Sequence, residues 1–331
     1  MGVRPLPNSE VVDRGMSLGQ DRPTVGAITI SASSLEDDRV PFMSALGIIA
    51  GAGFGRVSLF ARTGGAVLRP GGYPSQTFID VFASDYETLK ASLRRFDLSC
   101  PHIHAGWLDV SSDQSAATSA TEVAACAVGA RNVGCSVLTF SIGPILPRDL
   151  PERDRYPYLD RAARAFREMH DMLYDLPIRL GVDIHFRHPV ETVADATYVI
   201  QSSGQHQVGL SLNTGHLASA EQPGWNLIED LPAAVVSVAY KDHTPSQDEP
   251  YFKSLRLDRG TTPNYEYVRR LRHSGLDVYQ FLGIEDEAWE DKGMALYTSR
   301  RYIEDLWQRA GSEEDPTQSS VPPAATVGGG G

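Results

Sequence analysis

Residues 181–192, GVDIHFRHPVET, join a short apolar run to a group of polar residues, and two later segments repeat this pattern. These segments are VGLSLNTGHLA (208–218) and VAYKDHT (238–244). Apolar runs of this length are typical of parallel strands that are covered on both faces. The polar residues follow at the carboxyl end of each run. The pattern predicts a parallel sheet with a polar site at one edge.

Outward from these segments, short β-rich runs alternate with longer segments whose apolar residues recur every three or four positions, as expected for βα units. An open doubly wound sheet would also alternate, but ITISASSLEDD (28–38) lacks the glycine-rich turn typical of that fold. We therefore predict an α/β protein with the (β/α)8 (TIM barrel) fold. The eight expected strands are 24–30, 55–60, 98–104, 136–143, 178–185, 208–213, 235–240 and 277–285.

The segments between these strands predict helices that pack on the outside of the barrel. Three of them place apolar residues on one helical face. These sets are Phe42, Leu46 and Ile49; Leu159, Ala162, Phe166, Met169 and Leu173; and Ile303, Leu306 and Trp307.

The composition limits the domain organisation. The chain has 331 residues, 41% of them hydrophobic, which suits one barrel over residues 24–310. Residues 1–23 and 311–331 are rich in Pro, Gly and polar residues and are expected to be flexible tails. Cys100, Cys126 and Cys135 show no metal-binding spacing and are expected to be buried, reduced residues.

The charge and hydropathy of the chain exclude several classes of partner. The formal net charge is −12, and no Lys/Arg-rich run could bind nucleic acid phosphates. No stretch is long and apolar enough for a membrane span, and the first residues lack the apolar core of a signal peptide. We expect a soluble cytoplasmic protein that binds a small molecule. The sequence leaves its oligomeric state open.

Candidate site residues lie where strands of the predicted barrel end, which is where such barrels carry their catalytic groups. Six of the nine histidines lie at the ends of these strands or shortly after them. The polar residues at strand ends are His102, His104, Asp183, His185, Arg187, His188, Asn213, His216, Lys241, Asp242, His243, Glu285, Asp286 and Glu287.

Several of these residues carry a weaker signal. His188 precedes a proline and is interpreted as a solvated turn residue. Asp286 and Glu287 extend beyond a strand, His206 precedes one, and Arg62 is either an anion anchor or an exposed side chain.

Asp183, His185, Asn213, His216 and Glu285 form the stronger group, because such side chains are costly to bury unless they bind something. A divalent cation such as Mn²⁺, Mg²⁺, Co²⁺ or Zn²⁺ suits these ligands. A metal-free hydrogen-bonded network around an organic ligand uses the same side chains, so both alternatives remain open. No nucleotide cofactor is expected.

The three quoted segments, with LDRGTTPNYEYVRRLRHSGLDVYQFLGIE (257–285), resemble the xylose-isomerase-like barrel superfamily, specifically its sugar phosphate isomerase/epimerase group. The resemblance implies metal ligands at the ends of strands five to eight: Glu, Asp, His before a Lys-Asp pair, and Glu. In this sequence those positions hold Asp183, Asn213, Ala239 and Glu285. Only the last is unchanged, and Ala239 offers no ligand. His243, His185 and His216 are the candidate replacements.

The resemblance implies an isomerase or epimerase that removes a proton next to a carbonyl and returns it through an enediolate-type intermediate. Asp183 and Glu285 are the expected bases or metal ligands, with Asn213 and His243 as further candidate ligands. His185, His216 and Lys241 are expected to act in catalysis by contacting the substrate and stabilising charge. The other expected substrate contacts are His102, His104, Arg187, Asp242 and His243.

Two alternatives stay open. A lyase or dehydratase would begin with the same proton abstraction and then expel a leaving group. The substitutions at positions 213 and 239 also suit a metal-independent catalyst of specialised metabolism or a binding subunit. Endonuclease activity, also found in the superfamily, is disfavoured by the acidic charge.

Overall fold

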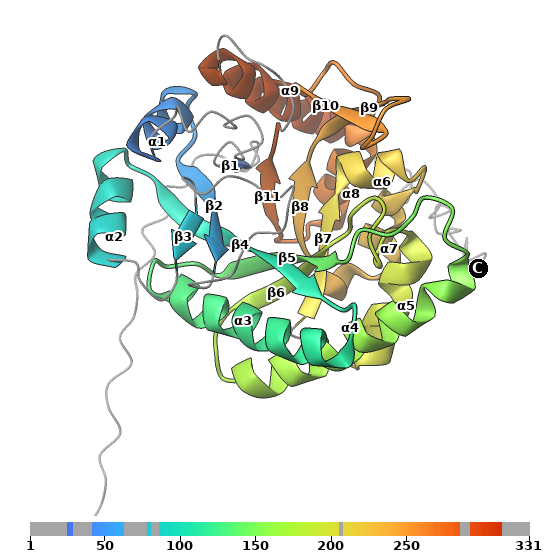
Figure 1. The fold of residues 1–331 in the computed structure, drawn as a ribbon. Coiled ribbons are helices and arrows are strands. Elements are labelled where there is room, and N and C mark those ends of the chain that lie inside the picture. Colours follow the sequence, from blue (N-terminus) through green and yellow to red (C-terminus); the bar gives the residue numbers. More distant parts are fainter. Residues whose placement is uncertain are drawn as a thin grey trace, which may run out of the picture.

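A ring of parallel strands forms the centre of the molecule (Figure 1). The computed structural model describes residues 25–28, 42–62, 78–80, 86–204, 208–284 and 292–312. Within these ranges eight strands close into a barrel, because the first pairs with both the second and the last. In ring order they are β1 (Val25–Ile28), β2 (Arg56–Arg62), β4 (Ser99–Asp109), β5 (Val137–Gly143), β6 (Arg179–Asp183), β7 (Val208–Asn213), β8 (Val235–Tyr240) and β11 (Tyr279–Leu282).

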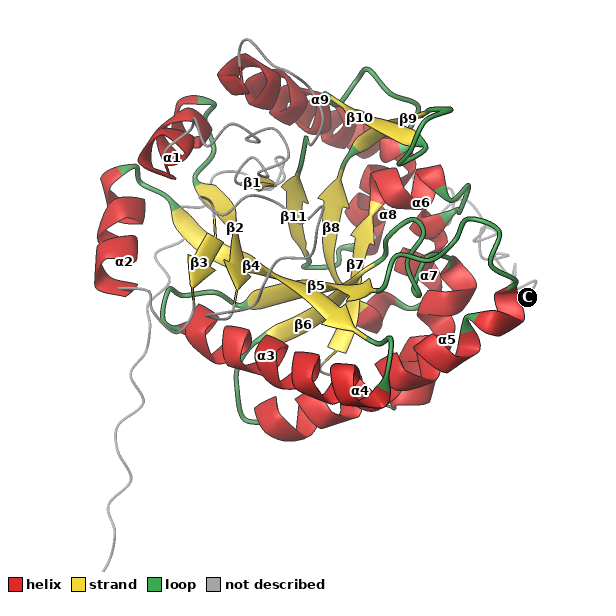
Figure 2. Ribbon diagram, viewed as in Figure 1, coloured by secondary structure: helices red, strands yellow, loops and turns green. Residues whose placement is uncertain are grey.

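Helices surround this ring, and Figure 2 shows them in red outside the yellow strands. They are α1 (Phe42–Gly51), α2 (Tyr86–Arg95), α3 (Asp113–Arg131), α4 (Tyr156–Leu173), α5 (Val193–Ser203), α6 (Thr214–Ser219), α7 (Leu227–Asp230), α8 (Asn264–Ser274) and α9 (Lys292–Ser312). Strands and helices alternate along the chain, so the predicted (β/α)8 barrel is confirmed. The expected tails lie outside the described residues, apart from Gly311 and Ser312 at the end of α9.

The apolar faces expected from the sequence are the faces that pack on the barrel. All five apolar residues predicted for the second face, on α4, are buried. On α9, Ile303 is buried, whereas Leu306 and Trp307 are partly buried against the same core. The three cysteines are buried and reduced. No helix in the described ranges is both long and apolar enough to cross a membrane.

Successive side chains along a strand point to opposite faces. One set packs under the surrounding helices, and the other set points into the interior of the barrel. On β7, Leu210 and Leu212 join the core beneath the helices. Inside the barrel, a separate apolar cluster consists of Val137, Val236, Ala239, Tyr279 and Phe281. We call it the lumen cluster.

The barrel is tightly packed where β6 and β7 face the start of β8. A Cβ added to Gly181 of β6 would lie 2.4 Å from Val236 Cγ2, and one added to Gly209 of β7 would lie 2.1 Å from the carbonyl oxygen of Ala234. Such distances are far below van der Waals contact, so the packing requires glycine at both positions.

Three strands of the structure were not expected from the sequence. β3 (Phe78–Asp80) extends the sheet beside β2. β9 (Asp242–Pro245) and β10 (Phe252–Leu255) form an antiparallel hairpin after β8. Each is only three or four residues long, too short for an alternating pattern to be recognised. The hairpin brings Phe252 to the carboxyl end of the barrel, against His243.

Candidate active site

The carboxyl ends of β6, β7 and β8 bring together three residues that the sequence places at strand ends. Asp183 is the last residue of β6, Asn213 is the last of β7, and Lys241 directly follows β8. All three are buried, with exposed fractions of 6%, 1% and 5%. A buried carboxylate and a buried ammonium at one barrel mouth are costly unless they interact with each other or with a ligand.

Asn213 connects the first of these groups to the next helix. Its Nδ2 donates a hydrogen bond to Asp183 Oδ2 at 3.0 Å. Its Oδ1 accepts from the backbone N–H of His216 at 3.5 Å and so caps the start of α6. One side chain therefore orients the carboxylate and also sets the position of His216.

Lys241 is held in place by its backbone. Its N–H donates to Thr214 Oγ1 at 3.0 Å, and its carbonyl accepts from Asn264 Nδ2 at 3.1 Å. Its Nζ lies 3.5 Å from His216 Nε2. An ammonium has no acceptor, so this imidazole nitrogen must accept, and the proton of the ring lies on Nδ1.

The histidines around Lys241 are uncharged at neutral pH. Burial, with a smaller contribution from the positive charge of Lys241, lowers the pKa of His104 to about 3. Burial also places the pKa values of His185, His216 and His243 well below the ordinary range, with smaller contributions from neighbouring histidines and Lys241. Each ring therefore offers one donor and one acceptor.

Three ring nitrogens in this group have no hydrogen-bond partner among the described residues. They are His185 Nδ1, His216 Nδ1 and His243 Nε2. The rings lie close together, with centroids 3.4 Å apart for His185 and His216 and 4.9 Å apart for His216 and His243. Buried polar atoms are usually satisfied in native proteins, so three such atoms in one cluster point to a ligand.

The tautomer of His243 follows from its neighbours. Ser219 Oγ donates to the carbonyl of Gly215 at 3.0 Å and therefore accepts from His243 Nδ1 at 2.9 Å. The other nitrogen of this ring, Nε2, is then an acceptor. The ring is stacked on Phe252 of the hairpin, with centroids 4.2 Å apart.

His104 and His102 extend the site along β4. The backbone N–H of Gly106 donates to His104 Nδ1 at 3.0 Å, so Nε2 carries the proton and donates to Ser141 Oγ at 3.3 Å. His102 lies at the lumen cluster, where it contacts Thr139 Oγ1 at 2.9 Å and stacks on Phe281. A substrate contact remains a prediction for both.

The loop after β6 corrects one interpretation of the sequence. His188 is only 2% exposed, donates from Nδ1 to the carbonyl of Ile142 at 2.6 Å, and stacks on Trp107 at 4.6 Å. The interpretation as a solvated turn residue is therefore wrong. Arg187, with a φ of 61°, donates to the carbonyl of Leu146 and to Glu249 Oε1. Its predicted substrate contact stays a prediction.

A buried ion network anchors this loop. Arg155 forms a salt bridge with Glu191 and lies 3.5 Å from Asp195 Oδ2. It also donates to the carbonyl of His188, while Glu191 accepts from the backbone N–H of Arg187. The loop that carries these residues is thus attached to the start of α4.

Replacing Arg155 with Met is expected to lower the free energy of unfolding by about 3–5 kcal/mol, because it leaves two buried carboxylates without their cation. Urea unfolding measures this change. Arg153→Met is the matched control, since the Arg153 side chain is 86% exposed, and its effect should stay within about 0.5 kcal/mol. Equal effects of the two substitutions would contradict the anchoring role.

Asp242, a predicted substrate contact, is turned toward a loop. Its Oδ2 accepts backbone N–H groups from Asp258, Arg259 and Gly260 at 2.9–3.2 Å, and its Oδ1 accepts that of Thr262 at 3.0 Å. Four such bonds fill most of the lone pairs of a carboxylate. The geometry gives Asp242 an anchoring role, and its predicted contact with substrate stays untested.

Some predicted residues are not described. Glu285, Asp286, Glu287 and His206 lie outside the described residues, as does the side chain of Arg62. Other residues near the site were missed by the sequence reasoning. Thr139 and Ser141 belong to β5, from which the sequence predicted no site residue. Trp107 lies in the part of β4 beyond the predicted end at residue 104.

The described donors do not fit a divalent cation. Asn213 directs its N–H toward Asp183, and its oxygen caps α6. Ala239 pairs with Asn213 and Phe281 across the sheet and belongs to the lumen cluster. The described residues contain no group of three or more His, Cys, Asp or Glu that could hold a metal ion.

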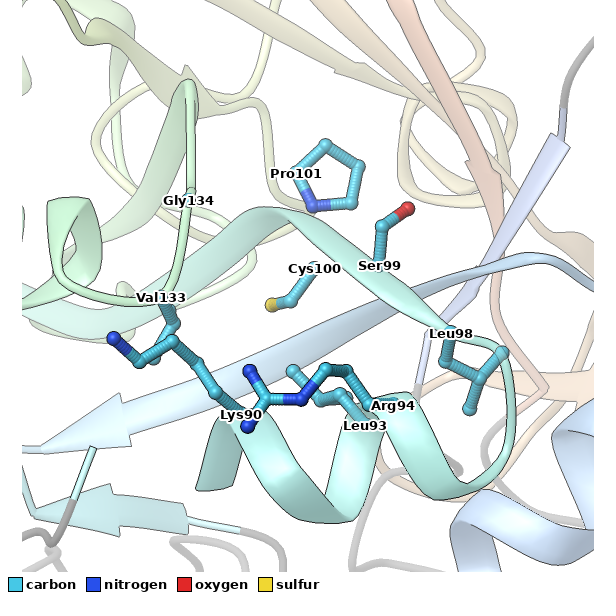
Figure 3. A pocket seen from close by; sticks show the side chains of 9 residues that line it. All are labelled: Lys90, Leu93, Arg94, Leu98, Ser99, Cys100, Pro101, Val133 and Gly134. Carbon is cyan, nitrogen blue, oxygen red and sulfur yellow. The ribbon is translucent and has the colours of Figure 1, made fainter. Parts of the chain in front are cut away.

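A separate cavity lies at the opposite, amino-terminal end of β4 (Figure 3). It has a volume of about 260 Å³ and is lined by side chains of α2, the start of β4 and the turn before β5. Lys90 and Arg94 lie on its α2 side. The position separates this cavity from the candidate active site, because the strands are parallel and share one direction.

Comparison with known proteins agrees with this fold. A family model described as "Xylose isomerase-like TIM barrel" matches residues 48–305. None of the curated proteins searched matches the chain.

Solved structures align over most of the chain. A D-tagatose 3-epimerase-like protein has a TM-score of 0.67 at 15% identity, covering 87% of this chain and 98% of its own. An L-ribulose 3-epimerase has a TM-score of 0.65 at 18% identity, covering 87% and 95%. An IOLI protein with a bound zinc atom has a TM-score of 0.66 at 10% identity, covering 88% and 100%. At these identities the likeness shows the fold.

Proposed function

Because the chain belongs to the xylose isomerase-like TIM barrel family, we propose that it is an isomerase or epimerase acting on a hydroxylated, carbonyl-containing small molecule. Proton abstraction next to the carbonyl would give an enediolate-type intermediate. Epimerases among the structural neighbours support this class of reaction.

The observation that carries the proposal is the convergence of Asp183, Lys241 and His216 at one barrel mouth. These residues supply a carboxylate oriented by Asn213, an ammonium, and a neutral imidazole 3.5 Å from that ammonium. A base together with donors for a developing oxyanion is the minimum that proton abstraction next to a carbonyl requires.

The donors and acceptors also indicate the substrate. Lys241 Nζ is a donor that suits a carbonyl oxygen, whereas His216 Nδ1 and His243 Nε2 are a donor and an acceptor that suit hydroxyl groups. A molecule with a carbonyl next to a hydroxylated carbon presents both groups at neighbouring positions. We propose a ketose, a cyclitol-derived ketone or a similar hydroxyketone.

In the proposed reaction, Asp183 removes the proton from the carbon next to the carbonyl. The electron pair of the C–H bond moves toward the carbonyl oxygen, which becomes an oxyanion opposite Lys241. His185 and His104 bind substrate hydroxyls. Glu285, which lies outside the described residues, is the proposed second carboxyl group that returns the proton.

A neutral imidazole is suitable for this position. An uncharged ring accepts from Lys241 at Nε2 and donates from Nδ1 to a substrate hydroxyl group, so one ring orients both the ammonium and the substrate. Burial, which lowers the pKa of His216, keeps the ring in this form. A divalent ion, expected from the resemblance and present in one zinc-bound neighbour, stays an alternative source of positive charge.

Solvent exchange tests the proposal. The protein is incubated in D2O with a panel of ketoses and cyclitol-derived ketones, and each substrate is followed by NMR. The expected result is deuterium at the carbon next to the carbonyl of at least one compound, with appearance of its epimer or isomer.

The same spectra separate the alternatives. Deuterium followed by loss of water would indicate the lyase reaction. Binding without exchange in any compound would contradict the isomerase and favour a binding subunit. Cytoplasmic location, a single domain over residues 24–310 and the absence of a nucleic acid partner remain predictions.

A further inference from the structure

The position where the resemblance implies a metal-binding imidazole is occupied by an apolar part of the barrel interior. Ala239 is 1% exposed and belongs to the lumen cluster with Val137, Val236, Tyr279 and Phe281. It offers no donor atom.

The neighbouring position, where the resemblance implies an Asp ligand, holds Asn213. A metal ligand needs an electron pair directed at the ion, but Asn213 directs an N–H group toward Asp183 Oδ2, at 3.0 Å. Its oxygen is bonded to the backbone N–H at the start of α6. An ion bound at Asp183 Oδ2 would have to displace this N–H group.

A positive charge already lies at this barrel mouth. The Lys241 ammonium is buried next to His216, and its charge acts on His104, His185, His216 and His243. These four imidazoles come from β4, the loop after β6, α6 and β9, so Lys241 lies among elements on several sides of the mouth. A dication at the same place would be repelled by it.

We propose that the Lys241 ammonium, in place of a divalent cation, supplies the positive charge that stabilises the oxyanion in this barrel. The inference rests on the proposed isomerase function. The base takes the proton from carbon, the electron pair moves to the carbonyl oxygen, and the ammonium opposes the negative charge. Reprotonation of carbon returns the electron pair, so the step consumes no co-reactant.

Metal content gives a test that does not depend on activity. Protein purified without chelator is analysed by elemental mass spectrometry, and exchange with the best substrate is measured before and after dialysis against EDTA. We expect far less than one equivalent of any divalent ion and an exchange rate unchanged within about twofold. A stoichiometric ion, with activity lost on chelation and restored by metal, would overturn the inference.

Variants of Lys241 test its charge directly. Lys241→Met is expected to lower kcat about 10²- to 10³-fold with a smaller change in KM, as for loss of an oxyanion donor. Lys241→Arg should retain part of the activity. Lys90→Met, on the outer helix α2, is the matched control.

Chemical rescue separates catalysis from structure. Ethylammonium added to Lys241→Ala should restore part of kcat, whereas it should not affect Lys90→Ala. A folded Lys241→Ala variant with normal kcat would overturn the inference.

The outcomes distinguish the two proposals. Exchange that depends on a bound metal would contradict the role of Lys241 proposed above but would still support the isomerase function. Absence of exchange with every substrate in the panel would contradict both the isomerase function and the role of Lys241.

Discussion

Replacing Asp183 with Asn should lower the rate of proton exchange about 10³-fold, because the amide has no basicity at neutral pH and a positioned general base contributes 10²- to 10⁴-fold. The fold should be retained. Asn213 Nδ2, which donates to Asp183 Oδ2, can donate equally to an amide oxygen at that position. The measurement is deuterium incorporation by NMR, with kcat and KM determined separately.

The matched control for this prediction is Asp160→Asn. Asp160 is an exposed residue of α4 whose carboxylate accepts from Tyr198 Oη. The Asp160→Asn substitution should leave the rate of proton exchange unchanged. If Asp183→Asn, folded and with an unchanged melting temperature, keeps more than a tenth of the wild-type rate, Asp183 is not the base.

The second large effect is a loss of stability in mild acid. Six buried histidines have lowered pKa values, mainly through burial: His102, His104, His185, His188, His216 and His243. The pKa of His188 falls to about 4 and that of His104 to about 3. In the unfolded chain these rings take up protons near pH 6.5.

Proton linkage determines the direction in which the stability changes with pH. Below about pH 6.5 the unfolded state binds more protons than the native state, so stability is fully present above this pH and falls as the pH decreases toward the native pKa values. Each proton contributes about 1.4 kcal/mol per pH unit. Six protons together reach roughly 8 kcal/mol per unit, comparable to the whole stability of a domain.

We therefore expect cooperative acid unfolding between about pH 6 and pH 4, with uptake of several protons. Circular dichroism as a function of pH locates the transition, and urea unfolding at pH 7.5 and 6 gives the slope. His188→Gln should reduce the slope by about one proton, whereas His273→Gln, on helix α8, is the matched control. A native state that persists below pH 4 would contradict the prediction.

The fold could be predicted because each βα unit has its own recognisable sequence pattern. An apolar run such as VGLSLN (208–213) is a strand by composition, and the apolar spacing of α4 defines its buried face. Polar residues at strand ends then have to meet, since parallel strands share one direction. In the structure, Asp183, Asn213 and Lys241 lie at the carboxyl ends of the neighbouring strands β6, β7 and β8.

The contacts within the site depend on distances that no spacing reveals. His188 lies next to a proline in a polar loop, yet Trp107 from another unit covers it. Asp242 has the residue type of a substrate contact, but a loop folds back 16 to 20 residues later and occupies its oxygens. The sequence indicates which groups reach the mouth of the barrel, and tertiary packing determines which of them face a ligand.

The double use of Asn213 also constrains how this site can change in evolution. An Asn213→Asp substitution would keep the helix cap but would place two carboxylates about 3 Å apart, where both cannot ionise without a compensating cation. Ala239 would have to become an imidazole within the apolar packing of the lumen cluster at the same time. The two changes are therefore expected to be strongly epistatic. A change at these two positions to the ligands that the resemblance implies is therefore expected to pass through a less stable intermediate.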